Sequence, residues 1–364
     1  MVLILTQENI VNLISMKEAI EAAEDAYRQC GHHPYLEAPE NRVYTPGPEK
    51  RIWLCANPGA TLQAVGSYSQ CSPRTSATLE DPSVRRWAPT PPPTWVVYSA
   101  ETAEILAVIF GQPMAQVKEG SRPVALGTAA ASSAVGIKHL ARQNATRLGL
   151  LGTGYQARAH LVAMCEIRPI KHVKVYSRSP EHREQFCREW EPVLEIPIEP
   201  VNSSKEAVQG VDIVMAATSS SVPVFDGHWL EPGVHVSPIV GSGHRETAVS
   251  GFHSIPRREI DEVTFQRADV IVVNFREQLI HHQTPSWFYA IERGALSLDQ
   301  VKDLAEVLVG KVPGRTSDEQ ITLYHNVIPS GSANVGIAYR LYEAAKRKGV
   351  GIEIALPQRG LEEE

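Results

Sequence analysis

The chain has 364 residues, 43% of them hydrophobic and 21% charged, and a formal net charge of −6 at pH 7. Because this length exceeds what one hydrophobic core normally serves, we expect two domains. The lack of a basic excess argues against a nucleic-acid partner, and no stretch approaches the roughly 20 apolar residues of a membrane-spanning helix. The five cysteines form no C-x-x-C pair and have no histidine at ligand spacing, so we expect no metal site, no disulfide framework and a cytoplasmic location.

The N-terminal part of the chain combines a helical opening with short strands. Apolar residues recur at helical spacing over residues 6–30, with an interruption near Ser15, which predicts an amphipathic helical segment. Proline and glycine clusters then separate four β-like runs: Arg51–Ala56, Thr61–Tyr68, Trp95–Tyr98 and Ile105–Ile109. The polar, proline-rich stretch Ser72–Pro93 interrupts them and is either a loop or a lid.

An alanine-rich segment, Thr128–Arg142, predicts a helix that leads into a nucleotide-binding unit. In that unit an apolar run at Leu148–Leu151 precedes a glycine turn, helix-compatible residues follow the turn, and Val173–Tyr176 is a second strand candidate. This order of strand, glycine turn, helix and strand is what a dinucleotide-binding site requires.

The glycine turn has the pattern Gly-x-Gly-x-x-Ala. Gly152 allows the tight turn, Gly154 lets the backbone approach a pyrophosphate, and Ala157 takes the position where the helix packs on the sheet. The pyrophosphate would accept hydrogen bonds from backbone N–H groups at the positive end of the helix that starts near Tyr155. The expected cofactor-binding residues are Thr128, Gly152, Thr153, Gly154, Tyr155, Gln156, Ala157, Ser177, Arg178, Ser179 and Thr218.

The end of the second strand indicates which nicotinamide dinucleotide is bound. An NAD site usually places Asp or Glu there to hold the ribose 2′-hydroxyl, whereas a 2′-phosphate needs the acid absent and a cation nearby. This chain has Ser177, Arg178 and Ser179 at that point. An arginine can pair with a phosphate bidentately and the serines can donate hydrogen bonds, so we expect NADP(H) to be favoured over NAD(H). The alternative is a solvated arginine on a loop.

The later elements define the domain organisation. Strand candidates at Val211–Thr218, His235–Val240 and Val270–Asn274 alternate with helical segments, and a last helix is expected from about Gly336 to Arg347. We therefore expect the α/β class, with a Rossmann-type doubly wound parallel sheet over residues 126–315. Residues 1–125 and 316–364 would then form a second, α+β substrate domain together.

Three stretches of sequence carry a family resemblance: Leu5–Glu24, Gly152–His160 and Gly310–Glu319. They are similar to the N-terminal helix pair, the Gly-x-Gly-x-Gln-Ala-x-x-His fingerprint and the late signature of the ornithine cyclodeaminase and mu-crystallin family. The resemblance implies a homodimer in which the two chain ends build the substrate and dimerisation domain around an inserted Rossmann domain. It also implies hydride chemistry on a small molecule, as cyclising deamination, amino-acid dehydrogenation or ketimine reduction.

The chain departs from the family pattern at three charged positions of the substrate site. The family's lysine is expected at Gly66, and no lysine occurs between Lys50 and Lys118; its arginine is expected at Gly127. The family's Gly-x-Asp loop appears as Gly241-Ser-Gly243, without the acid, and only Arg42 is retained. Each lost group would contribute on the order of 1.5–3 kcal/mol as a charged hydrogen bond, so we expect no ordinary α-amino-acid substrate.

The candidate catalytic residues are therefore substitutes for the family's own. Arg42 would orient an anionic or polar group of the substrate, and Tyr68, Ser69 or His244 would supply the proton. Imidazole titrates near neutral pH, although His244 is equally consistent with a solvated loop histidine. The pair His281-His282 is interpreted as solvated or dimer-facing.

The sequence favours an NADP(H)-dependent reductase of an imine or carbonyl substrate on a mu-crystallin-like scaffold. One alternative is a conventional ornithine cyclodeaminase or amino-acid dehydrogenase. The other is a non-catalytic NADPH-binding protein, which the missing charges would also suit.

Overall fold

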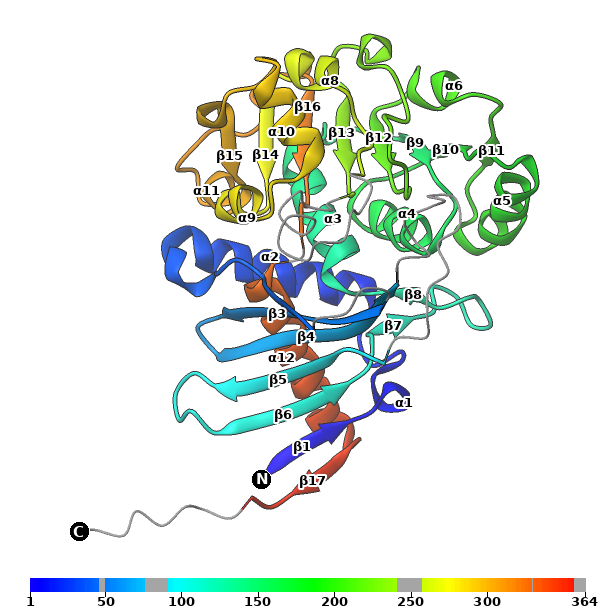
Figure 1. The fold of residues 1–364 in the computed structure, drawn as a ribbon. Coiled ribbons are helices and arrows are strands. Elements are labelled where there is room, and N and C mark those ends of the chain that lie inside the picture. The colour runs from blue at the N-terminus through cyan, green and yellow to red at the C-terminus, as the bar shows by residue number, and fades with distance from the viewer. Residues whose placement is uncertain (46–49, 76–90, 241–256, 329, 357–364) are drawn as a thin grey trace.

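The computed structural model describes residues 1–45, 50–75, 91–240, 257–328 and 330–356. Figure 1 shows two sheets, one above the other, with helices between and around them. The chain begins in the lower sheet, builds the upper one with its middle part, and returns to the lower sheet, where the N-terminal and C-terminal strands lie side by side.

The lower sheet has seven strands in the order β17-β1-β6-β5-β4-β3-β2. β1 pairs with β6 in parallel and with β17 in antiparallel fashion, and β2 to β6 follow one another as antiparallel neighbours. The strands are β1 (Val2–Leu5), β2 (Asn41–Tyr44), β3 (Lys50–Ala60), β4 (Ala64–Thr75), β5 (Thr94–Ser99), β6 (Ile105–Phe110) and β17 (Ile352–Ile354).

The two faces of this sheet differ because side chains alternate along a strand. On β3, Trp53 and Cys55 are buried while Ile52 and Leu54 are exposed. Two helices, α2 (Met16–His32) and α12 (Gly331–Lys348), pack on each other, and α12 packs on β3 and β4. We call the face that carries the buried residues the inner face and the opposite one the outer face.

The upper sheet has eight strands in the order β11-β10-β9-β12-β13-β16-β14-β15, and each neighbouring pair is parallel. The strands β12 and β14 are apolar throughout and fully buried, as expected for a parallel sheet that is covered on both faces. They are β9 (Arg147–Leu151), β10 (His172–Tyr176), β11 (Ile198–Pro200), β12 (Ile213–Ala216), β13 (His235–Pro238), β14 (Val270–Val273), β15 (Val301–Asp303) and β16 (Thr322–His325).

Helices cover both faces of the upper sheet. One hydrophobic cluster joins one face to α3 (Thr128–Leu140), α4 (Tyr155–Ile167) and α5 (Pro180–Leu194), and it continues without a break into α2 and α12. The other cluster joins the opposite face to α6 (Ser204–Val208), α8 (Glu262–Arg267) and α10 (Pro285–Glu292). The remaining elements are α1 (Gln7–Ile10), α9 (Arg276–His282), α11 (Leu304–Leu308) and the short pair β7 (Met114–Ala115) and β8 (Val124–Ala125).

A buried carboxylate ties the two domains together between α2 and α3. Glu24 accepts hydrogen bonds from Lys138 Nζ at 2.6 Å and from Arg28 Nη2 at 2.8 Å, and its Oε1 lies 2.8 Å from His139 Nε2. The bond to His139, together with those to Lys138 and Arg28, holds the pKa of Glu24 well below its usual range. The carboxylate therefore stays charged and links both helices.

The structure confirms the α/β class with a parallel sheet that the sequence predicted. The strands β1, β2 and β16 were not predicted; each pairs with strands from distant parts of the chain. β16 lies beyond residue 315, where the nucleotide domain was expected to end, yet it pairs with β13 and β14 inside the upper sheet. The chain thus completes the nucleotide domain before it enters α12.

Candidate dinucleotide and substrate site

The glycine turn lies at the carboxyl end of β9, in the middle of the upper sheet. Gly152 has φ +113°, and its backbone N–H donates to the carbonyl of Tyr176 at 2.8 Å. A Cβ at this position would lie 2.3 Å from the carbonyl oxygen of Ala217, so only glycine fits. The turn is therefore fixed by both neighbouring strands.

Gly154 leaves the space that a pyrophosphate needs. It is the N-cap of α4, and a Cβ placed on it would meet nothing within 4 Å. The first N–H groups of an α-helix have no partner within the helix and are free to bind an anion. Thr153 and Tyr155 flank this open position, Gln156 follows in the first turn of α4, and Ala157 is fully buried against the sheet. This arrangement fits a dinucleotide.

His160, the last residue of the fingerprint, has a structural role. It is fully buried, with Nδ1 2.8 Å from the carbonyl oxygen of Gln156 and Nε2 3.1 Å from the hydroxyl of Ser133. A neutral ring suits this position, because Nδ1–H donates to the carbonyl and Nε2 contacts the Ser133 hydroxyl, which itself donates to the carbonyl of Ala129 at 2.8 Å. Burial lowers the pKa of His160 to about 4. The histidine holds α4 against α3.

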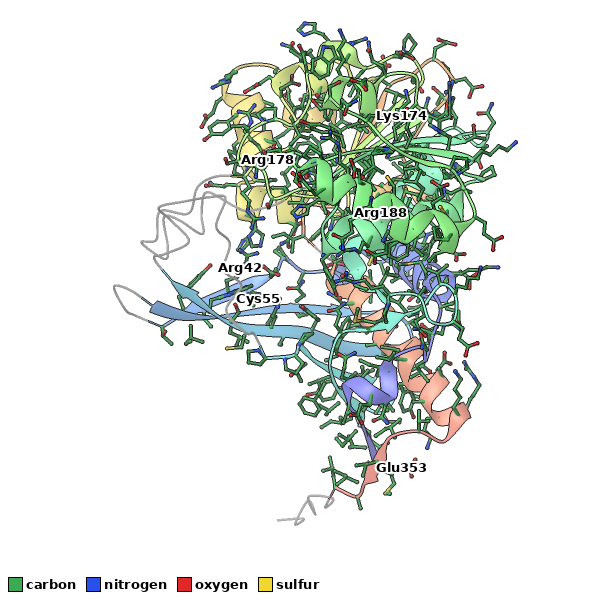
Figure 2. All side chains as sticks on the ribbon, turned by 90° about the vertical axis from the view of Figure 1, so that its right-hand side faces the viewer. Arg42, Cys55, Lys174, Arg178, Arg188 and Glu353 are labelled. Carbon is green, nitrogen blue, oxygen red and sulfur yellow. The ribbon has the colours of Figure 1, made fainter. Side chains whose placement is uncertain are left out.

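The loop after β10 presents a cation without an acid at the strand end. Arg178 is exposed, and Figure 2 shows it on the nucleotide domain. Ser177 donates to the carbonyl of Ser179 at 3.1 Å, and the Ser179 hydroxyl accepts from His182 N at 3.2 Å as the N-cap of α5. The two serines shape the loop, which leaves Arg178 as the residue with a free side chain for a phosphate.

The loops after β12 and β13 are joined by a buried acid that sequence reasoning missed. Glu259 accepts from Thr218 N at 2.6 Å and Thr218 Oγ1 at 2.8 Å, and from Ile239 N at 2.8 Å and Val240 N at 2.9 Å. Burial raises the pKa of Glu259 to about 7, while these donors act in the opposite direction. Thr218 is thus held in place at the carboxyl edge of the sheet.

Thr128 lies deeper than a cofactor contact would require. It is buried, its hydroxyl donates to Asn334 Oδ1 at 3.1 Å, and its carbonyl accepts from Asn326 Nδ2 at 3.2 Å. These bonds connect the start of α3 with α12 and with the end of β16. The structure therefore gives Thr128 a role in joining the two domains.

On the opposite side, Arg42 projects from the inner face of the lower sheet toward the nucleotide domain (Figure 2). Its Nε forms an ion pair with Glu40 Oε1, and its guanidinium lies 5.3 Å from the ring centroid of Trp53. Residues of α9 reach the same point: Gln278 Oε1 accepts from Glu40 N at 2.8 Å, and His282 Nε2 lies 3.9 Å from Glu40 Oε1. His282 is buried, so its expected position in solvent or at a dimer contact is wrong.

Tyr68 lies on the same inner face as Arg42. Its ring packs edge-on against Trp95 at 4.9 Å, and its hydroxyl donates to Gln70 Oε1 at 3.3 Å. Burial raises the pKa of Tyr68, and the nearby groups of Cys55, Glu40 and Tyr155 raise it further. The hydroxyl therefore keeps its proton at neutral pH beside the glycine turn.

Ser69 does not belong to this group. It pairs with Ala56 and Thr94, and the alternation of side chains along β4 places it on the outer face, opposite Tyr68. This placement contradicts its expected role as a proton donor.

Gly66 cannot hold a substitute side chain at the expected lysine position. A Cβ there would lie 2.2 Å from the carbonyl oxygen of Val96 on β5. Tyr68, two residues further on the same face, is the residue that fills this part of the site. Gly127 is the N-cap of α3, and the atoms nearest to a Cβ there would belong to the side chain of Gln112. His244 and the sequence Gly241-Ser-Gly243 lie outside the described residues.

Glu40, Glu259 and His282 are the site residues that sequence reasoning missed. Apart from the ion pair of Glu40 with Arg42, each of them contacts partners that are at least 19 residues away in the chain or on another domain. A signal was present for Glu40, since it stands directly before β2 and two residues before Arg42, a spacing that puts both side chains on one face of an extended chain.

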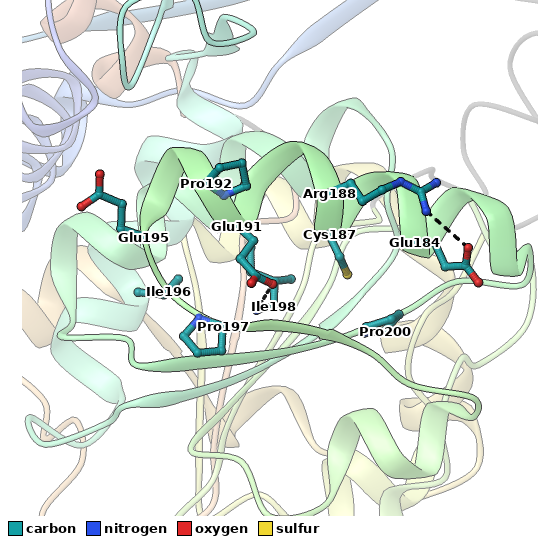
Figure 3. A pocket seen from close by; sticks show the side chains of 10 residues that line it. All are labelled: Glu184, Cys187, Arg188, Glu191, Pro192, Glu195, Ile196, Pro197, Ile198 and Pro200. Atoms are coloured by element: carbon teal, nitrogen blue, oxygen red, sulfur yellow. Dashed lines mark hydrogen bonds and ion pairs between the residues drawn. The ribbon is translucent and has the colours of Figure 1, made fainter.

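A separate hollow lies between α5 and the edge strand β11 (Figure 3). Its polar side chains pair among themselves or with the backbone: Arg188 Nη1 lies 3.5 Å from Glu184 Oε2, and Glu191 Oε2 accepts from Ile198 N at 3.2 Å. β11 lies beyond β10 at the border of the sheet, whereas the glycine turn follows β9. This hollow is therefore distinct from the candidate site.

Two further properties concern the described part of the chain. None of its helices combines the length and the apolar character that are needed to cross a bilayer. Within the same residues, no three side chains of the metal-binding types are grouped as ligands would be.

Comparison with known proteins gives both a family and full-length relatives. The model of the "Ornithine cyclodeaminase/mu-crystallin family" matches residues 99–346. A Delta(1)-pyrroline-2-carboxylate reductase of Bacillus cereus is 33% identical over 257 residues, which cover 70% of this chain and 71% of that protein.

Two solved structures share the fold over nearly the whole chain. Thermococcus litoralis Delta(1)-pyrroline-2-carboxylate reductase in complex with NADH and L-proline has a TM-score of 0.78 and 25% identity, over 97% of this chain and 100% of that one. An archaeal alanine dehydrogenase dimer with bound NAD has a TM-score of 0.75 and 26% identity, over 97% and 99% of the two chains.

Proposed function

The chain belongs to the ornithine cyclodeaminase/mu-crystallin family, and on this premise we propose that it is an NADP(H)-dependent oxidoreductase that reduces an imine or carbonyl compound. The observation that carries the proposal is the open glycine turn at Gly154, the start of α4, which lies above the lower sheet whose inner face bears Arg42 and Tyr68 (Figure 1). The reductases of Bacillus cereus and Thermococcus litoralis act on a cyclic imine, which supports the reaction type.

Residues of the nucleotide domain would hold the cofactor. The N–H groups at the start of α4 would bind the pyrophosphate, and Arg178 would pair with a 2′-phosphate. Thr218 and the backbone of Val240, both fixed by Glu259, lie at the strand ends where the nicotinamide half is expected. When bound, the reduced cofactor supplies a hydride.

Residues of the lower sheet would handle the substrate and the proton. Arg42 is positioned to orient a polar group, while Tyr68 has a protonated hydroxyl at neutral pH and can donate its proton to the nitrogen or oxygen that gains charge during reduction. Trp53 and Trp95 line the same inner face and would exclude water from the reacting centre. His244 remains a second candidate for the proton donor.

The experiment is a turnover assay with NADPH or NADH and a panel of cyclic imines, ketones and α-keto acids with amines. We expect NADPH oxidation with at least one imine or carbonyl compound, and a loss of roughly 100-fold or more in Tyr68→Phe if Tyr68 is the donor. Robust deamination of ornithine or alanine would instead return the chain to the conventional chemistry of its family. Tight NADPH binding without any turnover would favour a non-catalytic role.

We also propose that the protein is a homodimer. The outer face of the lower sheet carries apolar side chains, and the helices of the described chain lie on its other side (Figure 1). A contiguous apolar surface of this kind is typical of a protein interface, and the archaeal alanine dehydrogenase of the same fold is a dimer. The exposed residues of this face are Val43, Ile52, Leu54, Val65, Tyr98 and Phe110.

A cytoplasmic location is the third part of the proposal. All five cysteines are free, and three of them are buried, as is usual for a protein that folds in a reducing compartment.

A further inference from the structure

Arg42, the cation of the proposed substrate site, already forms an ion pair within the chain. Arg42 Nε contacts Glu40 Oε1, and the side chains are only 14% and 6% exposed. One side of the guanidinium lies over Trp53, 5.3 Å from the ring centroid. The pair is thus partly withdrawn from solvent, where the attraction between the two charges is stronger than at an open surface.

Residues of the nucleotide domain also hold Glu40 in place. Its backbone N–H donates to Gln278 Oε1 at 2.8 Å, and its carboxylate lies 3.9 Å from Nε2 of the equally buried His282. Both partners belong to α9, which follows the carboxyl end of β14. Glu40 therefore has a defined position between the lower sheet and α9.

The negative charge of Glu40 reaches the surface on which a substrate would bind. After burial, Glu40 is the main cause of the raised pKa of Cys55, and it also raises that of Tyr68 on the next strand. Cys55 lies directly opposite Arg42 in the β2–β3 ladder. The carboxylate thus faces the same part of the inner face as the proposed proton donor.

The ion pair of Glu40 with Arg42 disfavours a negatively charged substrate more than a neutral or positively charged one. A substrate carboxylate that approached Arg42 would meet the charge of Glu40 at short range and would have to share the guanidinium with it. A neutral imine meets no such repulsion, and its protonated form is attracted by the acid. Without Glu40, Arg42 would be an ordinary carboxylate-binding arginine.

We propose that Glu40 is a specificity-determining residue which, by pairing with Arg42, makes this site favour imines that carry no carboxylate over imino acids. The inference rests on the proposed imine reduction and names its substrate class. It separates this chain from the pyrroline-2-carboxylate reductases that it resembles, whose substrate is an imino acid by name.

The test compares two substrates that differ by one carboxylate, 1-pyrroline and Δ1-pyrroline-2-carboxylate, with NADPH and the full-length chain. Glu40→Gln removes the charge and keeps the shape, while Glu104→Gln, an exposed acid on the loop before β6, serves as the matched control. We expect the wild type and the control to prefer 1-pyrroline by kcat/KM. In Glu40→Gln, the ratio of the two kcat/KM values should shift at least tenfold toward Δ1-pyrroline-2-carboxylate, mainly through a change in KM.

A preference of the wild type for the imino acid that Glu40→Gln leaves unchanged would overturn the inference and leave the imine reductase intact. If neither imine is reduced, the proposed function is left to the wider substrate panel, and binding decides the role of Glu40. We then expect calorimetry of the NADP⁺ complex to show prolinamide binding at least tenfold more tightly than proline. This comparison needs no variant, so it also covers a Glu40→Gln chain that does not fold, and equal affinities would contradict the proposal.

Discussion

At the scale of a single residue, the proposed preference for NADPH depends on Arg178. It is exposed at the end of β10, while the hydroxyl groups of Ser177 and Ser179 form hydrogen bonds within the loop and to the first turn of α5. The arginine is therefore the main group that can tell NADPH from NADH. We expect Arg178→Ala to weaken NADPH binding by about 1–3 kcal/mol and to leave NADH nearly unaffected.

The measurement is a fluorescence titration of both reduced cofactors. Arg188→Ala, which removes an exposed arginine from α5 outside the loop, is the control and should change neither affinity. An equal loss for both cofactors in Arg178→Ala, or a preference of the wild type for NADH, would contradict the assignment.

His160 gives the protein a specific sensitivity to acid. Its folded-state pKa is about 4, below the ordinary value of 6.5, because burial disfavours the charged ring. The neutral histidine therefore contributes its full stability above pH 6.5, and this contribution is lost as the pH falls toward 4. At about 1.4 kcal/mol per pH unit, the loss reaches about 3 kcal/mol.

Urea denaturation between pH 7 and pH 4 measures this effect. The free energy of unfolding should fall more steeply with decreasing pH in the wild type than in His160→Gln, which cannot take up the proton. Parallel pH profiles would mean that His160 does not titrate in this range.

The residues of the site were predictable where local geometry requires one residue type. Gly152, Gly154 and Ala157 occupy the positions that a tight turn, a pyrophosphate and a close helix demand, and their spacing is visible in the sequence. Glu259 and His282 were missed because their partners lie on other elements, and no local pattern brings them together. Ser69 was placed in the site wrongly, since it stands next to Tyr68 in sequence but on the opposite face of the strand.

At the scale of elements, the glycine turn offers two substitutions with opposite effects. Gly154 has φ −81° and open space beside its Cα, so a valine fits the fold and occupies the place of the pyrophosphate. Gly152 has φ +113° and faces the carbonyl of Ala217, so even an alanine is strained there. We expect Gly154→Val to abolish NADPH binding while the melting temperature stays within about 2 °C of the wild type.

Gly152→Ala is the matched comparison, and it should lower the free energy of unfolding by more than about 1 kcal/mol. Thermal denaturation followed by circular dichroism, combined with cofactor titration, separates the two outcomes. Retained NADPH affinity in a folded Gly154→Val chain would show that the pyrophosphate binds elsewhere.

Sequence patterns predicted the elements that have a clear local signal better than the strands that depend on distant neighbours. The helices α3, α4 and α12 and the strands around the glycine turn have periodic or continuous apolar residues, and each appears close to its expected position. The strands β1, β2 and β16 have four residues each, and their identity depends on neighbours supplied by distant parts of the chain. Such pairing is decided by tertiary contacts, which a local pattern cannot show.

At the scale of the whole molecule, buried polar contacts hold the junction between the domains. Glu24 connects α2 with α3, Thr128 connects α3 with α12, and Glu40 connects β2 with α9. One hydrophobic cluster also runs through the junction. The candidate site thus lies on a rigid frame that both chain ends complete, and its residues come from segments that are far apart in sequence.

The outer face of the lower sheet is where the assembly can be tested. Leu54 and Val65 are 40% and 47% exposed on neighbouring strands of this face. If two copies bury it symmetrically, an aspartate at either position is taken out of water twice in each dimer, without a partner. We expect the wild type to behave as a dimer of the 40.0 kDa chain, and Leu54→Asp/Val65→Asp to associate roughly 1000-fold more weakly, a change of about 4 kcal/mol.

Sedimentation velocity across a range of concentrations gives the association constants. Val222→Asp, at an exposed valine of the nucleotide domain, should remain a dimer. The glycine turn and Arg178 lie in the nucleotide domain, so the monomeric variant should still bind NADPH with an affinity close to that of the wild type. A wild type that sediments as a monomer at micromolar concentration would contradict the homodimer, and a double aspartate variant that remains dimeric would place the subunit contact on another surface. The two results differ in meaning, because only the second leaves the homodimer itself intact and excludes the outer face as its interface.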